Sequence, residues 1–150
     1  MPPHQGREIS VHLTQFPEVN PEYMDAGLAQ NWNKMIALKG EISKAIETAR
    51  KNKVVGHSLD AGVDISASGE LRAFLETHLD DLKALLIVSE VAIAKEDVIK
   101  DPYASPEFAG LTIGVRKTRG KKCDRCWVYS ETVGVNSEHP TICERCVANL

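Results

Sequence analysis

All four cysteines of this 150-residue chain lie in two tetrapeptides of the form Cys-x-x-Cys. Cys123 and Cys126 form the first pair, Cys143 and Cys146 form the second, and 16 residues separate the pairs. Two residues between cysteines allow a tight turn to direct both sulfurs at one ion, and the intervening segment is long enough for a hairpin that brings up the second pair. The spacing therefore predicts a tetrahedral zinc site with four thiolate ligands.

A zinc site with four protein ligands has no open coordination position, so we expect one structural rather than catalytic ion. Zinc binding by small modules is worth about 10–16 kcal/mol, enough to fold residues 120–150, which contain almost no core of their own. A redox Cys-x-x-Cys would not need a second copy, whereas an iron–sulfur centre is chemically compatible with four thiolates. His139 could replace one cysteine or cap the hairpin beside Pro140, and we favour the cap.

Three residues inside or beside the cysteine pairs carry further hypotheses. A four-thiolate zinc centre has a formal charge of −2, which Arg125 and Arg145 could offset. Trp127 follows the second cysteine directly. Its ring could pack over the metal site as the centre of a small core, or its face could be exposed for stacking on a nucleic-acid base.

A basic segment leads into the cysteine module. Residues 116–125 hold six of the 18 lysines and arginines and one of the 21 acids, a net charge of +5, which leaves −8 for the rest of the chain. This asymmetry favours an anionic partner at that end, although the cations could simply offset the metal–thiolate charge. The candidates for contact with phosphate are Lys117, Arg119, Lys121 and Lys122, each of which could also be an ordinary solvated charge.

Periodicity predicts the elements that position these residues. Apolar residues recur at helical spacing from Leu28 to Ala49, which predicts an amphipathic helix that ends near Asn52, with Trp32 on its core face. Alternation over 59–67 predicts a strand, Ser68 a helix cap, and residues from about 80 a second helix. Two more strands are expected near 90–95 and 110–118.

The expected fold is therefore α+β. It combines a long amphipathic helix, a small, mostly antiparallel three-stranded sheet with two helices, and a C-terminal four-cysteine zinc module. We expect domains at 1–55 (the end of a helical region), 56–119 (a small α+β domain) and 120–150 (the zinc-binding module). The longest aliphatic run, Ala84–Val88, is too short to cross a bilayer, and the cysteines occur only as close pairs, so we expect a cytoplasmic protein without a membrane partner.

The cysteine region resembles a known family. "KKCDRCWVYSETVG" followed by "EHPTICERC" is similar to the C-terminal zinc-binding region of bacterial isoleucyl-tRNA synthetases, and "SVHLTQFPE" and "LKGEISKAIETARKNKVVGHSLDAGVDI" are similar to segments further upstream in those enzymes. The resemblance covers about residues 10–149. It implies a part that holds the anticodon arm of isoleucine tRNA, with Trp127, Arg125 and the neighbouring cations as candidate tRNA contacts and the rest of the synthetase as a partner.

The chain also departs from that family. It lacks the His-Ile-Gly-His and Lys-Met-Ser-Lys-Ser signatures of the catalytic domain, so we do not expect the chain alone to charge tRNA with isoleucine using ATP. We interpret it as a C-terminal fragment, made of the end of the anticodon-binding region and the zinc-binding domain, rather than a free-standing homologue.

Two other functions stay open. Formamidopyrimidine-type DNA glycosylases use a similar C-terminal zinc finger, but they need an N-terminal proline followed by a glutamate, whereas Pro2 here is followed by Pro3 and His4. The second alternative is a structural zinc module that joins proteins, for which the sequence offers no large apolar surface.

Overall fold

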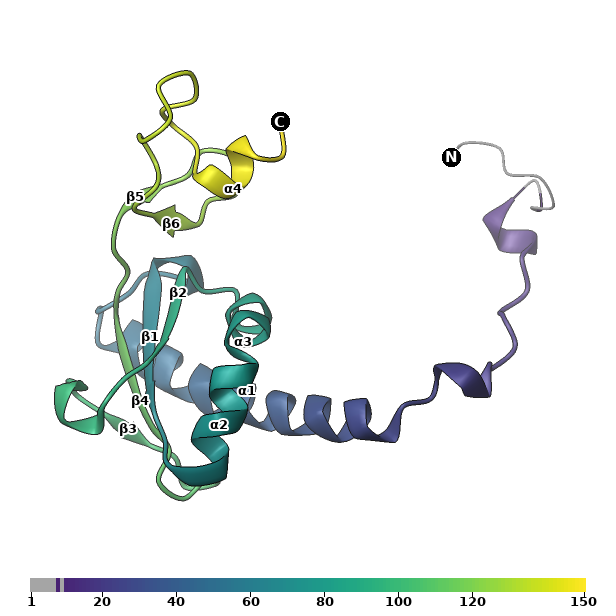
Figure 1. Cartoon of the computed structure of the whole chain (residues 1–150), viewed down its shortest axis with the longest axis horizontal. Helices are drawn as coiled ribbons and strands as arrows, with labels where there is room; N and C mark the ends of the chain where they lie inside the picture. The colour runs from purple at the N-terminus through teal and green to yellow at the C-terminus, as the bar shows by residue number, and fades with distance from the viewer. Residues whose placement is uncertain (1–7, 9) are drawn as a thin grey trace. The chain divides into compact units, whose positions relative to one another are not determined.

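The computed structural model describes residue 8 and residues 10–150, which fall into two units, 1–32 and 33–150 (Figure 1). The first unit contains the 3₁₀ helices η1 (Val11–Leu13) and η2 (Pro21–Tyr23) and the beginning of α1 (Ala26–Lys51). Pro2, Pro3 and His4, which bear on the glycosylase alternative, lie outside the described residues. The domain boundaries expected near residues 55 and 120 stay predictions.

The long helix α1 (Ala26–Lys51) confirms the helix predicted from apolar periodicity. Its buried residues begin at Met35 and include Leu38, Ile42 and Ile46. Trp32 is 42% exposed, so its assignment to the core was wrong. Periodicity identifies the apolar face of a helix but does not say which of its turns are covered, and here burial begins one turn after Trp32.

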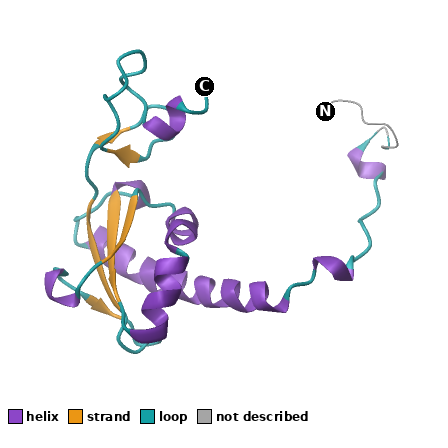
Figure 2. Ribbon diagram, in the orientation of Figure 1, coloured by secondary structure: helices purple, strands orange, loops and turns teal. Residues whose placement is uncertain are grey.

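The central sheet has four strands in the order β2-β1-β4-β3 (Figure 2). They are β1 (Ala61–Ser66), β2 (Glu90–Ile93), β3 (Tyr103–Ala104) and β4 (Thr112–Lys117). β1 pairs with β2 in parallel, and the other two pairings are antiparallel. The α+β class is confirmed, and β3 adds a fourth strand that the sequence analysis did not predict.

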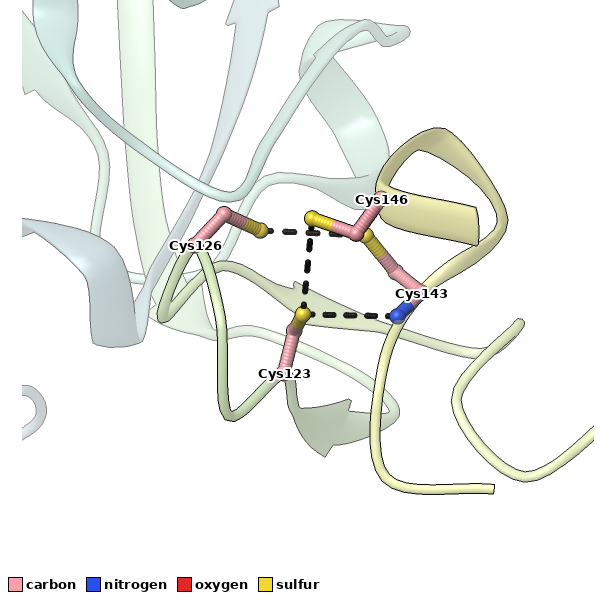
Figure 3. Close-up of side chains that lie close together, drawn as sticks. All are labelled: Cys123, Cys126, Cys143 and Cys146. Atoms are coloured by element: carbon pink, nitrogen blue, oxygen red, sulfur yellow. Dashed lines mark hydrogen bonds between the residues drawn. The ribbon is translucent and has the colours of Figure 1, made fainter. Parts of the chain in front are cut away.

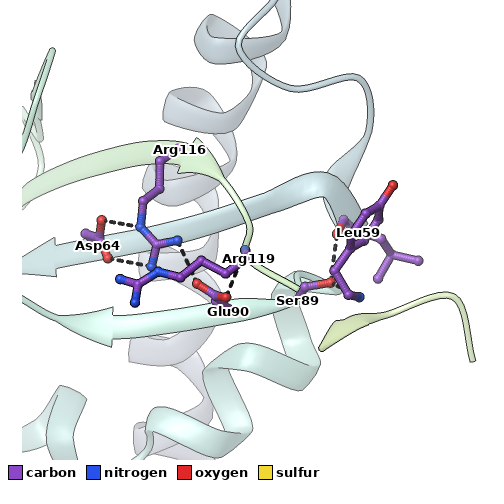
Figure 4. Close-up of polar contacts among 7 residues, drawn as sticks. Leu59, Asp64, Ser89, Glu90, Arg116 and Arg119 are labelled. Carbon is purple, nitrogen blue, oxygen red and sulfur yellow. Dashed lines mark hydrogen bonds and ion pairs between the residues drawn. The ribbon is translucent and has the colours of Figure 1, made fainter. Parts of the chain in front are cut away.

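The core forms where helices pack against one face of this sheet. α2 (Gly69–Thr77) and α3 (Leu79–Leu86) make the crossover between β1 and β2 and contribute Leu75 and Leu82 to the same core cluster as α1. The opposite face is polar: Arg116 of β4 forms ion pairs with Asp64 at 2.8 Å and with Glu90 at 2.6 Å (Figure 4). Two further 3₁₀ helices, η3 (Ser58–Asp60) and η4 (Glu96–Val98), lie in the connections.

A buried carboxylate joins α1 to the segment that begins at β3. Glu41 is fully buried and accepts hydrogen bonds from the hydroxyl of Ser105 at 2.5 Å and from that of Tyr103 at 3.3 Å. Lys44, one turn away, forms an ion pair with it. The bond from Lys44 and the bond from Ser105 lower the pKa of Glu41, so its charged form stabilises the fold above the unfolded pKa near 4.5, and this stabilisation is lost as pH falls through the lower folded value.

Replacing Ser105→Ala should destabilise the chain by about 1–3 kcal/mol, because a buried carboxylate loses a short hydrogen bond. Urea unfolding at pH 7 measures this loss. Tyr103→Phe is the matched control: it removes the longer bond to the same carboxylate and should cost less. Equal stability of Ser105→Ala and the parent chain would show that Glu41 does not need this donor.

The C-terminal segment forms a separate small module within the second unit. β5 (Lys121–Lys122) pairs antiparallel with β6 (Tyr129–Ser130), and α4 (Glu144–Val147) follows a long turn-rich loop. We call residues 120–150 the cysteine module, and residues 33–119 the α+β body. In the part of the chain that the structure describes, no helix has the length and apolar character needed to span a membrane.

Candidate metal centre

The four cysteine sulfurs converge on one point in the cysteine module (Figure 3). Cys123 and Cys126 lie in the turn between β5 and β6, Cys143 is the N-cap residue of α4, and Cys146 lies inside that helix. All four Sγ atoms are within 4.8 Å of one another. The sulfur of Cys123 lies 3.8 Å from that of Cys146, and the sulfur of Cys126 lies 3.7 Å from that of Cys143.

These separations fit a tetrahedral zinc ion. Four sulfurs at about 2.3 Å from a central ion lie about 3.8 Å from one another. A disulfide would instead require about 2.05 Å between two sulfurs, and all four cysteines are free. The donor set is therefore spaced for an ion and not for cross-linking.

The backbone holds both cysteine pairs in tight turns. The N–H of Trp127 donates to the carbonyl of Cys123 at 2.9 Å, and the N–H of Cys146 donates to the carbonyl of Cys143 at 2.9 Å. The N–H of Cys143 also donates to the sulfur of Cys123 at 3.3 Å, which links one turn to the other. Each pair thus presents its two sulfurs from a closed turn, as the two-residue spacing predicts.

The surroundings of the sulfurs separate two of their pKa values. Burial raises the pKa of the Cys123 thiol, but the N–H groups of Cys126, Cys143 and Arg125 lower it by more. The resulting pKa of Cys123 is about 6, below its ordinary value. Burial and the neighbouring sulfurs raise the pKa of Cys146 to about 12. At neutral pH an ion that binds all four sulfurs must therefore displace the Cys146 proton, so metal affinity should weaken as pH falls.

The cysteine module has little apolar core beyond its sulfurs. Its buried cluster consists of Cys123, Cys143, Cys146 and Val133, with Ile142 packed against it. Three of the four buried members are thus cysteines of the candidate site. His139 is not in the sulfur cluster; its N–H donates to the side chain of Asn136 at 3.0 Å within the loop.

The two arginines between the cysteines have different environments. The thiol of Cys126 and the other nearby sulfurs raise the pKa of Arg145, so this guanidinium lies where it can offset thiolate charge. Arg125 instead donates through Nη1 to the carbonyls of Cys146 at 2.8 Å and Asn149 at 3.0 Å. Arg125 therefore ties its own turn to the end of α4, where the Cys146 carbonyl also accepts the Asn149 N–H at 3.3 Å.

Trp127 extends away from the small core. Its side chain is 61% exposed, and Lys122 Nζ lies 5.7 Å from the centre of its ring. Its φ of 64° is in the left-handed region, which is uncommon for a residue other than glycine. Of the two interpretations left open by the sequence, the arrangement fits an exposed ring with an adjacent cation and not a ring packed over the metal.

The candidate phosphate contacts lie along one stretch of chain. Lys117 ends β4, Lys121 and Lys122 form β5, and the side chains of Lys117, Arg119, Lys121 and Lys122 are all exposed. The backbone N–H of Arg119 donates to Glu90 at 3.0 Å, and within residue 8 and residues 10–150 its guanidinium forms no ion pair. The four exposed cations thus lie in the segment that directly precedes Cys123, and Lys122 of this segment lies beside the exposed ring of Trp127.

One buried hydroxyl connects the cysteine module to the α+β body. Ser89, which is 2% exposed, donates to the carbonyl of Leu59 at 2.7 Å (Figure 4) and accepts the N–H of Tyr129 at 2.8 Å. Next to this connection is a cavity of about 810 Å³, lined by the body through residues such as Lys83 and by the module through residues such as Arg145.

Ser89 was missed by the sequence analysis. A single serine between Val88 and Glu90 carries no pattern, and its two partners are 30 and 40 residues away in the chain. Only the folded structure brings together Leu59 in η3, Ser89 just before β2 and Tyr129 at the start of β6.

Comparison with known proteins identifies what this metal site resembles. Residues 120–149 match the zinc finger found in FPG and IleRS. The match covers all four cysteines and both closed turns, so the cofactor of the module is one structural zinc ion.

The rest of the chain is similar to isoleucine–tRNA ligases. The chain is 45% identical over 141 residues to the enzyme of Geobacter sulfurreducens and 43% identical over 143 residues to that of Caldanaerobacter subterraneus subsp. tengcongensis. Each alignment covers 94% of this chain and 15% of the relative. The enzyme of Carboxydothermus hydrogenoformans is 40% identical over 148 residues, which is 99% of this chain and 16% of the relative.

These matches confirm the resemblance inferred from the cysteine motifs and the upstream segments. The chain is similar to one part of isoleucine–tRNA ligases and spans about 15% of the length of the curated relatives that it matches. The similarity extends through the α+β body as well as the zinc finger.

Proposed function

We propose that this chain is the tRNA-binding, C-terminal part of an isoleucine–tRNA ligase and contributes to holding the anticodon arm of isoleucine tRNA. The observation that carries the proposal is the similarity of almost the whole chain to such ligases, at 40–45% identity. The exposed Trp127 and the cations before it support the proposal independently, because they provide a surface suited to RNA.

In this proposal the residues have distinct roles. Cys123, Cys126, Cys143 and Cys146 hold the zinc ion, which folds the cysteine module and takes no part in chemistry. Trp127 stacks on an unpaired base, and Lys122 beside it contacts a neighbouring phosphate. Arg125 chiefly positions the end of α4, since its Nη1 is already bonded to two carbonyls.

The other cations supply attraction to the RNA backbone. Lys117, Arg119 and Lys121 precede Lys122 along the same stretch and face solvent. ATP-dependent charging of tRNA belongs, in this proposal, to the parts of the ligase outside this chain, which are its second partner. The chain itself has a binding role.

The module of a formamidopyrimidine-type glycosylase is the weaker alternative. The zinc-finger family includes FPG, so residues 120–149 alone are compatible with either protein. The alignments to isoleucine–tRNA ligases also cover the α+β body, and this favours an RNA partner over DNA.

Reversing two charges tests this proposal. The zinc-loaded chain should bind isoleucine tRNA with an affinity that falls with salt, and Lys121→Glu with Lys122→Glu should weaken binding about 30-fold at 0.15 M salt, because each lost phosphate contact costs about fivefold under these conditions. Lys95→Glu with Lys100→Glu makes the same charge change at exposed sites in the α+β body and should change affinity much less.

The exposed ring needs a separate measurement in the same assay. Trp127→Ala should weaken binding about tenfold without changing the salt dependence, since stacking on a base does not release counterions. Unchanged affinity in both the charge-reversal and the tryptophan variants, or equal affinity for duplex DNA and tRNA, would contradict the proposal.

A further inference from the structure

A second group of cations surrounds a concave surface at the C-terminal end of α1. The concavity has a volume of about 670 Å³ and is formed by the end of α1, the turn after it and the end of β4. Its charged lining residues are Glu47, Arg50, Lys51, Lys53, Asp60 and Lys117. Of these, only Lys117 belongs to the basic segment identified from the sequence.

The two carboxylates of the lining are already engaged. Glu47 forms an ion pair with Arg50 at 2.7 Å. Asp60 accepts the N–H groups of Gly56 and His57 at 3.2 Å each, and it also faces the His57 ring at 3.3 Å. Within residue 8 and residues 10–150, no ion pair involves Lys51, Lys53 or Lys117, so the concavity has an excess of positive charge.

The stability of the helix explains only part of this charge. Arg50 and Lys51 lie in the last turn of α1, where cations interact favourably with the helix dipole. Lys53 lies beyond the helix, with φ of 59° and its N–H bonded to the carbonyl of Arg50 at 3.0 Å. Glycine is favoured at such a left-handed helix end, so lysine at position 53 lowers the stability of the backbone conformation. Within the described residues, no ion pair of the Lys53 side chain offsets this cost.

Lys117 connects this concavity to the approach to the zinc centre. It lies opposite Ala61 in the β1–β4 pairing, which places it beside the end of the connection from α1. Arg119, Lys121 and Lys122 follow it within five residues. The exposed cations of the concavity and those of the cysteine module are therefore joined along the chain by the short segment 117–122, whose length suits an extended polyanion better than a small anion.

We propose that the concavity formed by Lys51, Lys53 and Lys117 is a second RNA-backbone site, which binds phosphodiesters of the same RNA that contacts the zinc module. This inference rests on the proposed function and adds a contact region on the α+β body. RNA is favoured over an acidic protein segment because exposed cations continue along the chain from Lys117, in the concavity, to Lys122, which lies beside the exposed ring of Trp127 where a base can stack.

Lys53→Gly separates binding from stability, because the two properties should change in opposite directions. The variant should have an equal or higher melting temperature, since glycine suits the left-handed position. It should bind isoleucine tRNA about fivefold more weakly at 0.15 M salt, and its slope of log affinity against log salt should be smaller by about one unit. Lys117→Gln, on the other wall, should give a similar loss.

Lys39→Gln is the matched control, because it removes an exposed lysine of α1 that lies about three turns before Lys51 and outside the concavity. Its affinity for isoleucine tRNA should match that of the parent chain. If Lys53→Gly and Lys117→Gln also bind like the parent while the Lys121 and Lys122 reversals bind weakly, the second site is overturned and the proposed function stands. Absence of any tRNA binding by the parent chain would overturn both.

Discussion

Removal of zinc should unfold residues 120–150 and leave the α+β body folded. The buried cluster of the cysteine module consists of three cysteines and Val133, so the ion supplies most of what holds it together. Structural zinc is worth about 10–16 kcal/mol in small modules, far more than a cluster of this size contributes. The body has its own core around Leu38, Ile42, Ile65 and Ile113 and does not depend on the ion.

Metal analysis together with hydrogen exchange measures this result. The purified chain should contain one zinc ion, and a tight chelator should remove amide protection from residues 120–150 while amides in α1 and β1 stay protected. Cys146→Ser should reproduce the effect without a chelator. His139→Ala, in the same module but outside the sulfur cluster, should retain zinc. A metal-free chain with full protection in the module would refute the structural role of the ion.

Gly120→Ala should displace the cysteine module even when zinc is present. Gly120 has φ of 80°, and a Cβ atom there would lie 2.3 Å from the carbonyl carbon of Ser130 and 2.5 Å from the nitrogen of Glu131. Both are backbone atoms, so no side-chain rotation can relieve the clash. The substitution combines this overlap with an unfavourable backbone conformation, and we expect a loss of about 3 kcal/mol or more.

Gly110→Ala measures the conformational part of that loss alone, so the difference between the two variants gives the steric part. Gly110 has a similar φ of 75°, but a Cβ there would meet its nearest atom, the Ser68 hydroxyl oxygen, at 3.7 Å. It should therefore show only the cost of the left-handed backbone, about 1 kcal/mol. Urea unfolding and zinc retention of the two variants measure the difference. Equal losses would mean that the approach of β6 to Gly120 is not tight in solution.

Sequence patterns predicted best those features that a short spacing determines. Four cysteines in two close pairs led directly to the sulfur cluster, because each pair needs only a local turn. The apolar periodicity of α1 and the alternation in β1 likewise gave elements close to the observed Ala26–Lys51 and Ala61–Ser66. In each case neighbouring residues contain the whole signal.

Features that depend on distant partners could not be predicted in the same way. β3 has only two residues, Tyr103 and Ala104, too few for any periodicity to show, and it exists because β4 offers an edge. Arg125 was assigned to charge compensation or RNA, yet it bonds to carbonyls more than 20 residues away. The exposure of Trp127 also follows from the left-handed turn after Cys126, which the composition of the motif does not reveal.

The placement of Ser89 suggests an order for the folding of the two parts. Its hydroxyl can accept the Tyr129 N–H in the observed geometry only when Leu59 and Ser89 already lie side by side, and the pairing of β1 with β2 is what brings them together. The anchor for the cysteine module is thus built by the body and not by the metal. We therefore expect the body to fold first and the zinc-loaded module to attach to it afterwards, so that a late docking step, rather than metal capture, fixes how the module is oriented on the body.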